Sequence, residues 1–425
     1  NLRNNKNIWK KIPSYKDFKE KIESEKSNNS ELLNSNENIK ENIEKLIDIN
    51  EQRENKKEKH LNHIIIGEIV IIKPLVERII NSYENVYREK YSCVWNDNSS
   101  IKNEEQIKEC EIYINEQKID FNYYYKFPNK GSYIIKYIFK SPLTSTNFMF
   151  CDCQSLTSLD LSQFNIQNII NMRNMFTNCK SLKSINLSNF NTYNVKDMSN
   201  MFDGCKSLAS LDLSNFNTSN VINMTNMFNN CKSLLTLNIS NFNTKNVINM
   251  ISMFSNCRSL TSLNLSNLNT GKVTHMGFMF FDCSSLISLD LTSFITKNVI
   301  DMTHIFDGCK SLISLNLSTF ITNNVINLSH MFYDCYSLTQ LNLPNFNTQK
   351  VHTMEYMFYG CKSLIFLDLS NFNFNKVKNI GYMFDECISL ICLELPDFNF
   401  QNIKNKDKIF SGCNSMILKI INNFN

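Results

Sequence analysis

The stretch VKDMSNMFDGCKSLASLDLSNFNTSN, residues 195–220, is one copy of a unit that returns along most of the chain. Its cysteine, Cys205, has equivalents every 26 residues without an insertion or deletion. A constant period of this size indicates a repeat protein, in which each unit buries its apolar face by stacking on its neighbours. We therefore expect function on a long surface and not in a pocket. The cysteine column comprises Cys153, Cys179, Cys205, Cys231, Cys257, Cys283, Cys309, Cys335, Cys361, Cys387 and Cys413.

The spacing of apolar residues changes within each unit. From Val195 to Cys205 the steps are three and four, which is typical of one face of a short helix. From Leu211 to Leu213 the step is two, as in a short strand with one buried face. The following Asn217-Thr218-Ser219-Asn220 has side chains that bond nearby backbone groups in turns. The predicted fold is an α/β repeat solenoid, leucine-rich-repeat-like, with a short helix and a short parallel strand in each unit.

Two further regions precede the repeats. Residues 1–60 carry 26 charged side chains and several Asn and Ser runs, which favours a linker or a loosely helical arm. Residues 61–142 contain β-branched and aromatic runs, and Pro128-Asn129-Lys130-Gly131 separates the last two as a turn. We expect a small, mostly-β module there that caps the apolar edge of the first coil. The solenoid itself is expected over residues 143–421, in 11 units.

Charge and hydropathy limit the classes of partner. The net charge of +4 is too small to indicate nucleic-acid binding. The longest apolar stretch outside the repeats, Ile64–Ile72, is far shorter than the roughly 20 residues that span a bilayer, so we expect no membrane insertion. The chain begins at Asn1 with a polar stretch and no apolar signal region, which we interpret as the result of processing or truncation. No cofactor and no oligomeric state is indicated.

The motif around the strand resembles a known family. Leu-x-x-Leu-x-Leu at Leu208–Leu213 is joined to Met-Phe-x-x-Cys-x-Ser-Leu upstream and to Ser-x-Phe-Asn-Thr-x-x-Val-x-x-Met downstream. This pattern resembles the BspA-like leucine-rich-repeat surface proteins in their 26-residue form, over residues 143–418. The resemblance implies a curved solenoid whose strands line the concave side and which serves in adhesion or host-factor binding. It favours the cell surface as the location, with the cytoplasm as the alternative.

We therefore expect a non-enzymatic protein that binds a protein or glycan through its concave face. The alternative is an intracellular scaffold or regulatory region attached to an upstream domain, such as a kinase, which reduced thiols would favour. The outward positions beside the strand leucines are the candidate contacts, and their apolar end, at Ile365, Phe366 and Ile391, is the first place to look. The full set is Asp212, Asn238, Asn264, Asp290, Asn316, Asn342, Ile365, Phe366, Asp368, Ile391 and Glu394.

Catalytic and metal chemistry are not favoured by the sequence. The column cysteines are interpreted as buried thiols, because a disulfide needs Cβ atoms that converge to about 4 Å and free Cys packs as a small hydrophobe. His304 and His330 share a repeat position, with Asp307 and Asp334 three and four residues on, so a surface metal site is an alternative. Because other repeats place Asn, Phe, Tyr or Lys there and no four-ligand set is evident, we expect no metal. A stripe of Lys and Arg after the cysteines is interpreted as a solvated edge, with an acidic partner as the alternative.

Overall fold

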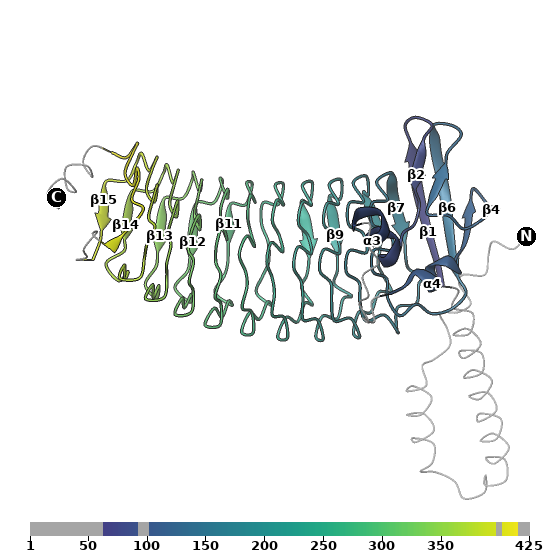
Figure 1. Cartoon of the computed structure of the whole chain (residues 1–425), viewed down its shortest axis with the longest axis horizontal. Coiled ribbons are helices and arrows are strands. Elements are labelled where there is room, and N and C mark those ends of the chain that lie inside the picture. The colour runs from purple at the N-terminus through teal and green to yellow at the C-terminus, as the bar shows by residue number, and fades with distance from the viewer. Residues whose placement is uncertain (1–62, 92–101, 397–401, 415–425) are drawn as a thin grey trace, which may run out of the picture. The chain divides into compact units, whose positions relative to one another are not determined.

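The computed structural model describes residues 63–91, 102–396 and 402–414, all within one compact unit, 62–425 (Figure 1). The predicted arm, residues 1–60, lies outside the described residues, as does the end of the predicted solenoid beyond residue 414. Two kinds of structure are present, a small module with mixed elements and a long row of stacked coils.

The module is built on antiparallel strands with two helices beside them. A buried face of β-branched and aromatic residues, including Ile65, Ile69, Ile135 and Tyr137, packs inward from its long strands. The elements are β1 (His63–Ile71), β2 (Val76–Arg78), α3 (Tyr83–Tyr91), α4 (Glu104–Lys108), β3 (Glu111–Ile114), β4 (Gln117–Ile119), β5 (Tyr124–Lys126) and β6 (Gly131–Phe139).

The sheet of this module continues directly into the coils. Strand β1 pairs antiparallel with β6 on one side and with β7 (Leu156–Asp160), the first strand of the repeats, on the other. Strand β7 pairs parallel with β8 (Ser184–Asn186), so one sheet runs in the order β4-β3-β6-β1-β7-β8. Gly67 sits where a Cβ would approach the side chains of Leu156 and Leu159 to 3.1 Å, which allows the close contact. The module therefore covers the open edge of the first coil.

Each later strand lies in the predicted Leu-x-Leu segment, and where two such strands pair, they are parallel and 26 residues apart. The pairs and the triple are β9 with β10, β11 with β12 and β13, and β14 with β15. A second ladder of single-residue parallel bridges follows every coil, from Ser145 to Asn405 in ten steps. The strands are β9 (Ser210–Asp212), β10 (Thr236–Asn238), β11 (Ser288–Leu289), β12 (Ser314–Asn316), β13 (Gln340–Asn342), β14 (Phe366–Asp368) and β15 (Cys392–Glu394).

The predicted short helix of each repeat is wrong. Among the described residues, helices occur only in the module, as α3 and α4. Residues 195–205 instead form consecutive turns, in which the N–H of Met201 donates to the carbonyl of Met198. Left-handed residues, Asn200 at φ 56° and Gly204 at φ 74°, interrupt the chain every four residues and prevent helical propagation. The fold is a β-solenoid with leucine-rich-repeat-like strands and not an α/β solenoid.

The same left-handed residues explain how neighbouring coils join. Within residues 198–204 every second N–H points along the solenoid and donates to a carbonyl of the next coil. The N–H groups of Asn200 and Phe202 donate to Thr225 and Met227 at 2.8 and 2.9 Å. Turns thus satisfy half of the backbone donors, and the neighbouring coil satisfies the other half. The helix-like spacing of apolar side chains arises from turns that each advance three or four residues.

Apolar columns fill the interior. The Phe three residues before each column cysteine stacks on its equivalent in the next coil. The ring centroids lie 5.3 Å apart for Phe384 and Phe410 and 6.0 Å apart for Phe150 and Phe176. From Cys179 to Cys413, each column cysteine donates its Sγ–H to a Phe carbonyl of the preceding coil, as Cys205 does to Phe176 at 3.2 Å. The prediction of buried free thiols is confirmed for Cys153 to Cys387, whereas Cys413 is half-buried.

Candidate functional site

The strand face, which we define as the outward side chains of β7 to β15 and of the equivalent residues 262–264, together with the residue before each strand, runs along the solenoid. Alternation along each strand creates it: Leu211 is buried, and Ser210 and Asp212 on either side are exposed. All of the candidate contacts are solvent-exposed on this face. Their role in binding stays a prediction. The exposed set is Asp212, Asn238, Asn264, Asp290, Asn316, Asn342, Ile365, Phe366, Asp368, Ile391 and Glu394.

The polar column of this face also ends the strands. The Oδ1 atom of Asp212 accepts the backbone N–H of Ser214 at 3.0 Å, and Asp290 accepts that of Thr292 at 3.0 Å. These hydrogen bonds lower the pKa of both carboxyls below the usual range. An Asp or Asn side chain that bonds the backbone two residues on is a turn device. Sequence reasoning missed this role, although the recurring Ser or Thr two positions later was a visible signal. The same bond is made by Asn238, Asn264, Asn316 and Asp368.

Two members of the column cannot make that bond. Pro344 and Pro396 stand two residues after Asn342 and Glu394, where the donor would be, and proline has no N–H. The side chains of Asn342 and Glu394 are both exposed. The C-terminal part of the strand face therefore carries polar groups whose acceptors are not committed to the turn.

An apolar column runs beside the polar one. It consists of the residue before each strand, and five of its members are Leu or Ile with 42–57 % of their surface exposed. Neighbours are held side by side by the backbone, since the N–H of Ile313 donates to Ile287 at 3.2 Å and that of Ile391 to Ile365 at 3.0 Å. Phe366 adds an exposed ring. The sequence indicated only the end of this column, which comprises Leu235, Ile287, Ile313, Ile365 and Ile391.

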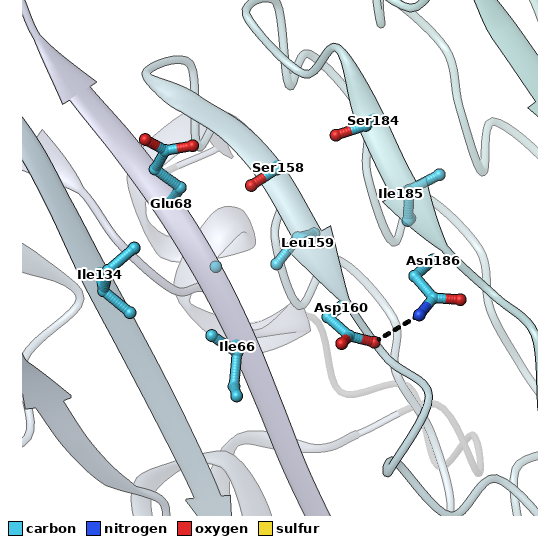
Figure 2. A pocket seen from close by; sticks show the side chains of 10 residues that line it. Ile66, Glu68, Ile134, Ser158, Leu159, Asp160, Ser184, Ile185 and Asn186 are labelled. Carbon is cyan, nitrogen blue, oxygen red and sulfur yellow. Dashed lines mark hydrogen bonds between the residues drawn. The ribbon is translucent and has the colours of Figure 1, made fainter.

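At the module end the strand face has a shallow hollow of ≈ 370 Å³ (Figure 2). Strands β1 and β6 contribute Ile66 and Ile134, both partly exposed, and β7 and β8 contribute Asp160 and Asn186. The Nδ2 of Asn186 donates to Oδ1 of Asp160 at 2.9 Å, as Figure 2 shows. The lining contains no His, Cys, Lys or Arg. The lining mixes exposed Ile side chains with Ser, Asp, Glu and Asn, a composition that suits a contact surface.

The basic stripe makes contacts with its own neighbours. Arg258 pairs with Asp282, with Nε 2.7 Å from the carboxylate. The ammonium groups of Lys310 and Lys362 lie 5.3 and 5.1 Å from the centroid of the Tyr336 ring, one from each adjacent coil. These contacts give members of the stripe a structural role, and an acidic partner for it stays the untested alternative to a solvated edge.

The two histidines in one repeat position come together, as their spacing predicted. The rings of His304 and His330 stack with centroids 4.2 Å apart, and Nδ1 of His304 lies 2.7 Å from Oδ2 of Asp307. Burial, followed by the charge of His304, lowers the pKa of His330 to about 4. Burial raises the pKa of Asp307 above its usual range. Asp334, the other carboxylate considered from the sequence, instead accepts the hydroxyl of Tyr336 at 3.0 Å.

Comparison with known proteins identifies the family. The family model described as "Mycoplasma protein of unknown function, DUF285" matches residues 144–262, 209–315 and 306–424, which together cover more than half of the chain. The chain belongs to this family. The DUF285 matches coincide with the coils and leave out the β1–β6 module. The more specific resemblance to BspA-like surface proteins stays a prediction.

Two solved structures are similar to this DUF285 chain. One is a leucine-rich repeat protein from Eubacterium ventriosum ATCC 27560, with 14% identity, a TM-score of 0.29, and coverage of 62% of this chain and 78% of that chain. The other is a TLR13–ssRNA13 complex, with 17% identity, a TM-score of 0.14, and coverage of 58% and 46%. The comparison with curated proteins gives no match.

Most cysteine thiols of this DUF285 chain are buried and have low reactivity. Burial raises the pKa of the column thiols, such as Cys231 and Cys257, so these sulfurs are poor nucleophiles at neutral pH. Cys392 is exposed on the strand face. Because buried thiols are protected wherever the protein resides, they do not discriminate between the cell surface and the cytoplasm. Within the described residues, no helix has the length and hydropathy needed to cross a bilayer.

Proposed function

We propose that this chain is a non-enzymatic interaction protein that binds a protein partner through the strand face. The observation that supports this most is the apolar column Leu235, Ile287, Ile313, Ile365 and Ile391, with Phe366 beside it. Thr261 and Thr339 interrupt the column, so its apolar members lie as Leu235 and the adjacent pairs Ile287–Ile313 and Ile365–Ile391. Clusters of large exposed apolar side chains mark interaction sites. Fully burying one such side chain contributes roughly 1.5–3 kcal/mol, so half-exposed members supply about half of that each on binding.

The polar column gives the proposed surface its specificity. Asp368 and Glu394 flank Phe366 and Ile391 and carry negative charge at the edge of the apolar residues. A partner that presents apolar side chains between Lys or Arg would match this pattern, because charges at the rim of an interface set orientation and association rate. Further negative charges of the polar column, Asp290 and Asp212, are exposed in earlier coils.

A glycan partner is less well supported by this surface. Sugar rings are held in proteins by exposed aromatic faces together with several polar groups. Within the described part of the strand face, Phe366 is the one exposed aromatic side chain of the repeat strands. The half-buried rings elsewhere, from Phe278 to Tyr382, have their faces covered by one another at 4.2–4.8 Å. We therefore favour a protein.

The test uses substitutions that the repeats themselves contain. Ile365→Thr, Phe366→Ser and Ile391→Thr replace the apolar residues by those found in equivalent positions at Thr339, Ser314 and Thr261, so the fold is preserved. A matched control is Ile222→Thr, Ile248→Thr and Ile326→Thr, which removes equally exposed Ile residues from a different column that has Thr274 at the same position.

The readout is capture of partners by a photo-crosslinking residue placed at Glu394, which holds no turn, in wild type and in both triple variants. We expect discrete protein adducts that the first triple variant loses and the control retains. Adducts that survive Ile365→Thr, Phe366→Ser and Ile391→Thr, or that disappear equally in the control, would remove the strand face as the binding surface. A glycan-only adduct would replace the protein partner by a carbohydrate.

A further inference from the structure

The His304 position departs from the rest of its column in a way that the interaction surface does not use. Most repeats place Asn or an aromatic residue at this left-handed position, at φ 54° for His304 and 58° for His330. Only two adjacent coils place imidazoles there, and the next turn of one of them adds the carboxylate of Asp307. One ligand atom from each of these three side chains lies within 4.8 Å of the other two.

The surroundings hold these three groups in place. The His304 ring is stacked on Phe278 at 4.4 Å, and the His330 ring on Tyr356 at 4.8 Å, so aromatic neighbours hold the two imidazoles next to each other. Asp307 is only 11% exposed and His304 24%. Side chains whose positions are set by packing lose little entropy on binding an ion. The carboxylate of Asp307 holds the orientation of the His304 ring through its 2.7 Å contact with Nδ1.

The electrostatics of the position favour a cation. Asp282 and Asp334, in the coils before and after Asp307, both act on it as like charges. Arg258 pairs with Asp282, and Lys310 and Lys362 lie near Asp334, so the opposing cations are at the flanks. Asp307 itself is buried, and its only basic partner among the described residues is His304. A divalent ion would offset this concentration of negative charge.

We propose that His304, Asp307 and His330 bind a divalent transition-metal ion, with Zn²⁺ the best match, that ties two adjacent coils together. Two imidazoles and one carboxylate form a ligand set that zinc accepts, with water as the fourth ligand. Bonds of about 2.0–2.1 Å in a tetrahedron place ligand atoms about 3.3 Å apart. Ligand atoms that lie up to 4.8 Å apart therefore have to converge by about 1.5 Å, so both imidazoles must tilt from their stacked positions when the ion binds. Ca²⁺ and Mg²⁺ are poor matches because they prefer oxygen ligands.

The repeats supply variants that remove each ligand and keep the fold. His304→Asn and His330→Asn introduce the residue that occupies the same left-handed position at Asn200 and Asn226. Asp307→Asn introduces the residue found at Asn229. The matched control, His352→Thr, removes an exposed histidine from a position that holds Thr274 in another coil.

The experiment titrates the full chain, in a Cys93→Ser and Cys392→Ser background, with Zn²⁺ against a chromophoric chelator and with Co²⁺ by absorption. We expect one saturable Zn²⁺ equivalent in wild type and in His352→Thr, and its loss in His304→Asn and His330→Asn. Asp307→Asn should weaken binding by at least the roughly 10–100-fold caused by removing a partner of a metal ligand. Zn²⁺ should also raise the melting temperature of wild type and leave that of the two His variants unchanged.

Two results would overturn the proposal. One is equal Zn²⁺ stoichiometry and affinity in wild type and in the His304→Asn, His330→Asn double variant, with both proteins folded by circular dichroism. The other is a Co²⁺ spectrum dominated by the intense near-ultraviolet band of thiolate ligation, which would assign the ion to cysteine. Absence of saturable binding at micromolar Zn²⁺ in wild type counts against it equally.

Discussion

Replacing Asn226 by Ala and by Gly tests whether this segment forms left-handed turns or a helix. The Gly variant should be the more stable of the two in a left-handed turn, and the Ala variant in a helix. Asn226 has φ 54° and lies in the segment whose apolar spacing is that of a helix. Its Nδ2 donates to Oδ1 of Asn200 at 3.0 Å. Both substitutions remove this hydrogen bond equally, so it cancels when the two variants are compared with each other.

The expected difference follows from backbone energetics. Ala in a left-handed conformation costs roughly 1–2 kcal/mol, because its Cβ approaches the following carbonyl oxygen. Gly has no such strain but loses more conformational entropy on folding, by about 0.4–1 kcal/mol relative to Ala. The Gly variant should therefore have the larger free energy of unfolding, by about 1 kcal/mol. In a helix interior the order reverses, and Gly is less stable than Ala by about 1 kcal/mol.

Urea unfolding followed by circular dichroism measures this difference, provided that the m-values of the two variants agree. Ala209→Gly serves as the control, because Ala209 is not left-handed and the substitution should destabilise. If Asn226→Ala proved more stable than Asn226→Gly while Ala209→Gly behaved as expected, the turn structure of residues 221–231 would be refuted.

Three further predictions test other parts of the structure. A bulky thiol reagent should label Cys392 rapidly in the native state and leave the column cysteines Cys153 to Cys387 unmodified, since they are buried and burial raises the pKa of their thiols. Mass spectrometry measures the labelled sites, and label at most column cysteines would contradict the stacked interior. Hydrogen bonds from Arg88 hold the pKa of Glu104 at about 2, against an ordinary value of 4.5. Its stabilising contribution is therefore complete above pH 4.5 and lost as pH falls toward 2, so Glu104→Gln should flatten the pH dependence of unfolding in that window. Deleting residues 222–247, one whole period, should lower the melting temperature much less than deleting residues 222–234, which breaks the ladder from Ser145 to Asn405; equal losses would argue against in-register stacking.

The periodic features of the structure were predictable because they depend on side-chain type alone. The column cysteines, the strand leucines and the exposure of residues such as Asp212 and Phe366 follow from an invariant 26-residue frame and strand alternation. The adjacency of His304 and His330 followed from the same frame. The frame does not specify the backbone conformation between the repeated positions.

The wrong prediction of a helix shows this limit. Steps of three and four occur both in a helix and in successive turns, so apolar spacing alone does not separate them. The deciding signal was the position before each cysteine, which is Asn, Asp or Gly in every repeat except at Glu386, and which is left-handed throughout. An Asn, Asp or Gly at the same position in repeat after repeat argues against a helix interior, where these residues are disfavoured.

Some repeated polar residues form hydrogen bonds that hold the coils or turns together, and other repeat positions do not have this role. This difference indicates where binding can evolve. Thr218 donates its hydroxyl to Asn243 of the next coil at 3.1 Å, and its equivalents repeat the contact. Asp212 and its equivalents hold the turns after the strands. Such residues are constrained by folding, so their constancy carries no information about a partner. The side chains of the apolar column and of the His304 position instead vary in type from coil to coil. Selection on binding can act at these positions without disturbing the stack, and both proposals place function there.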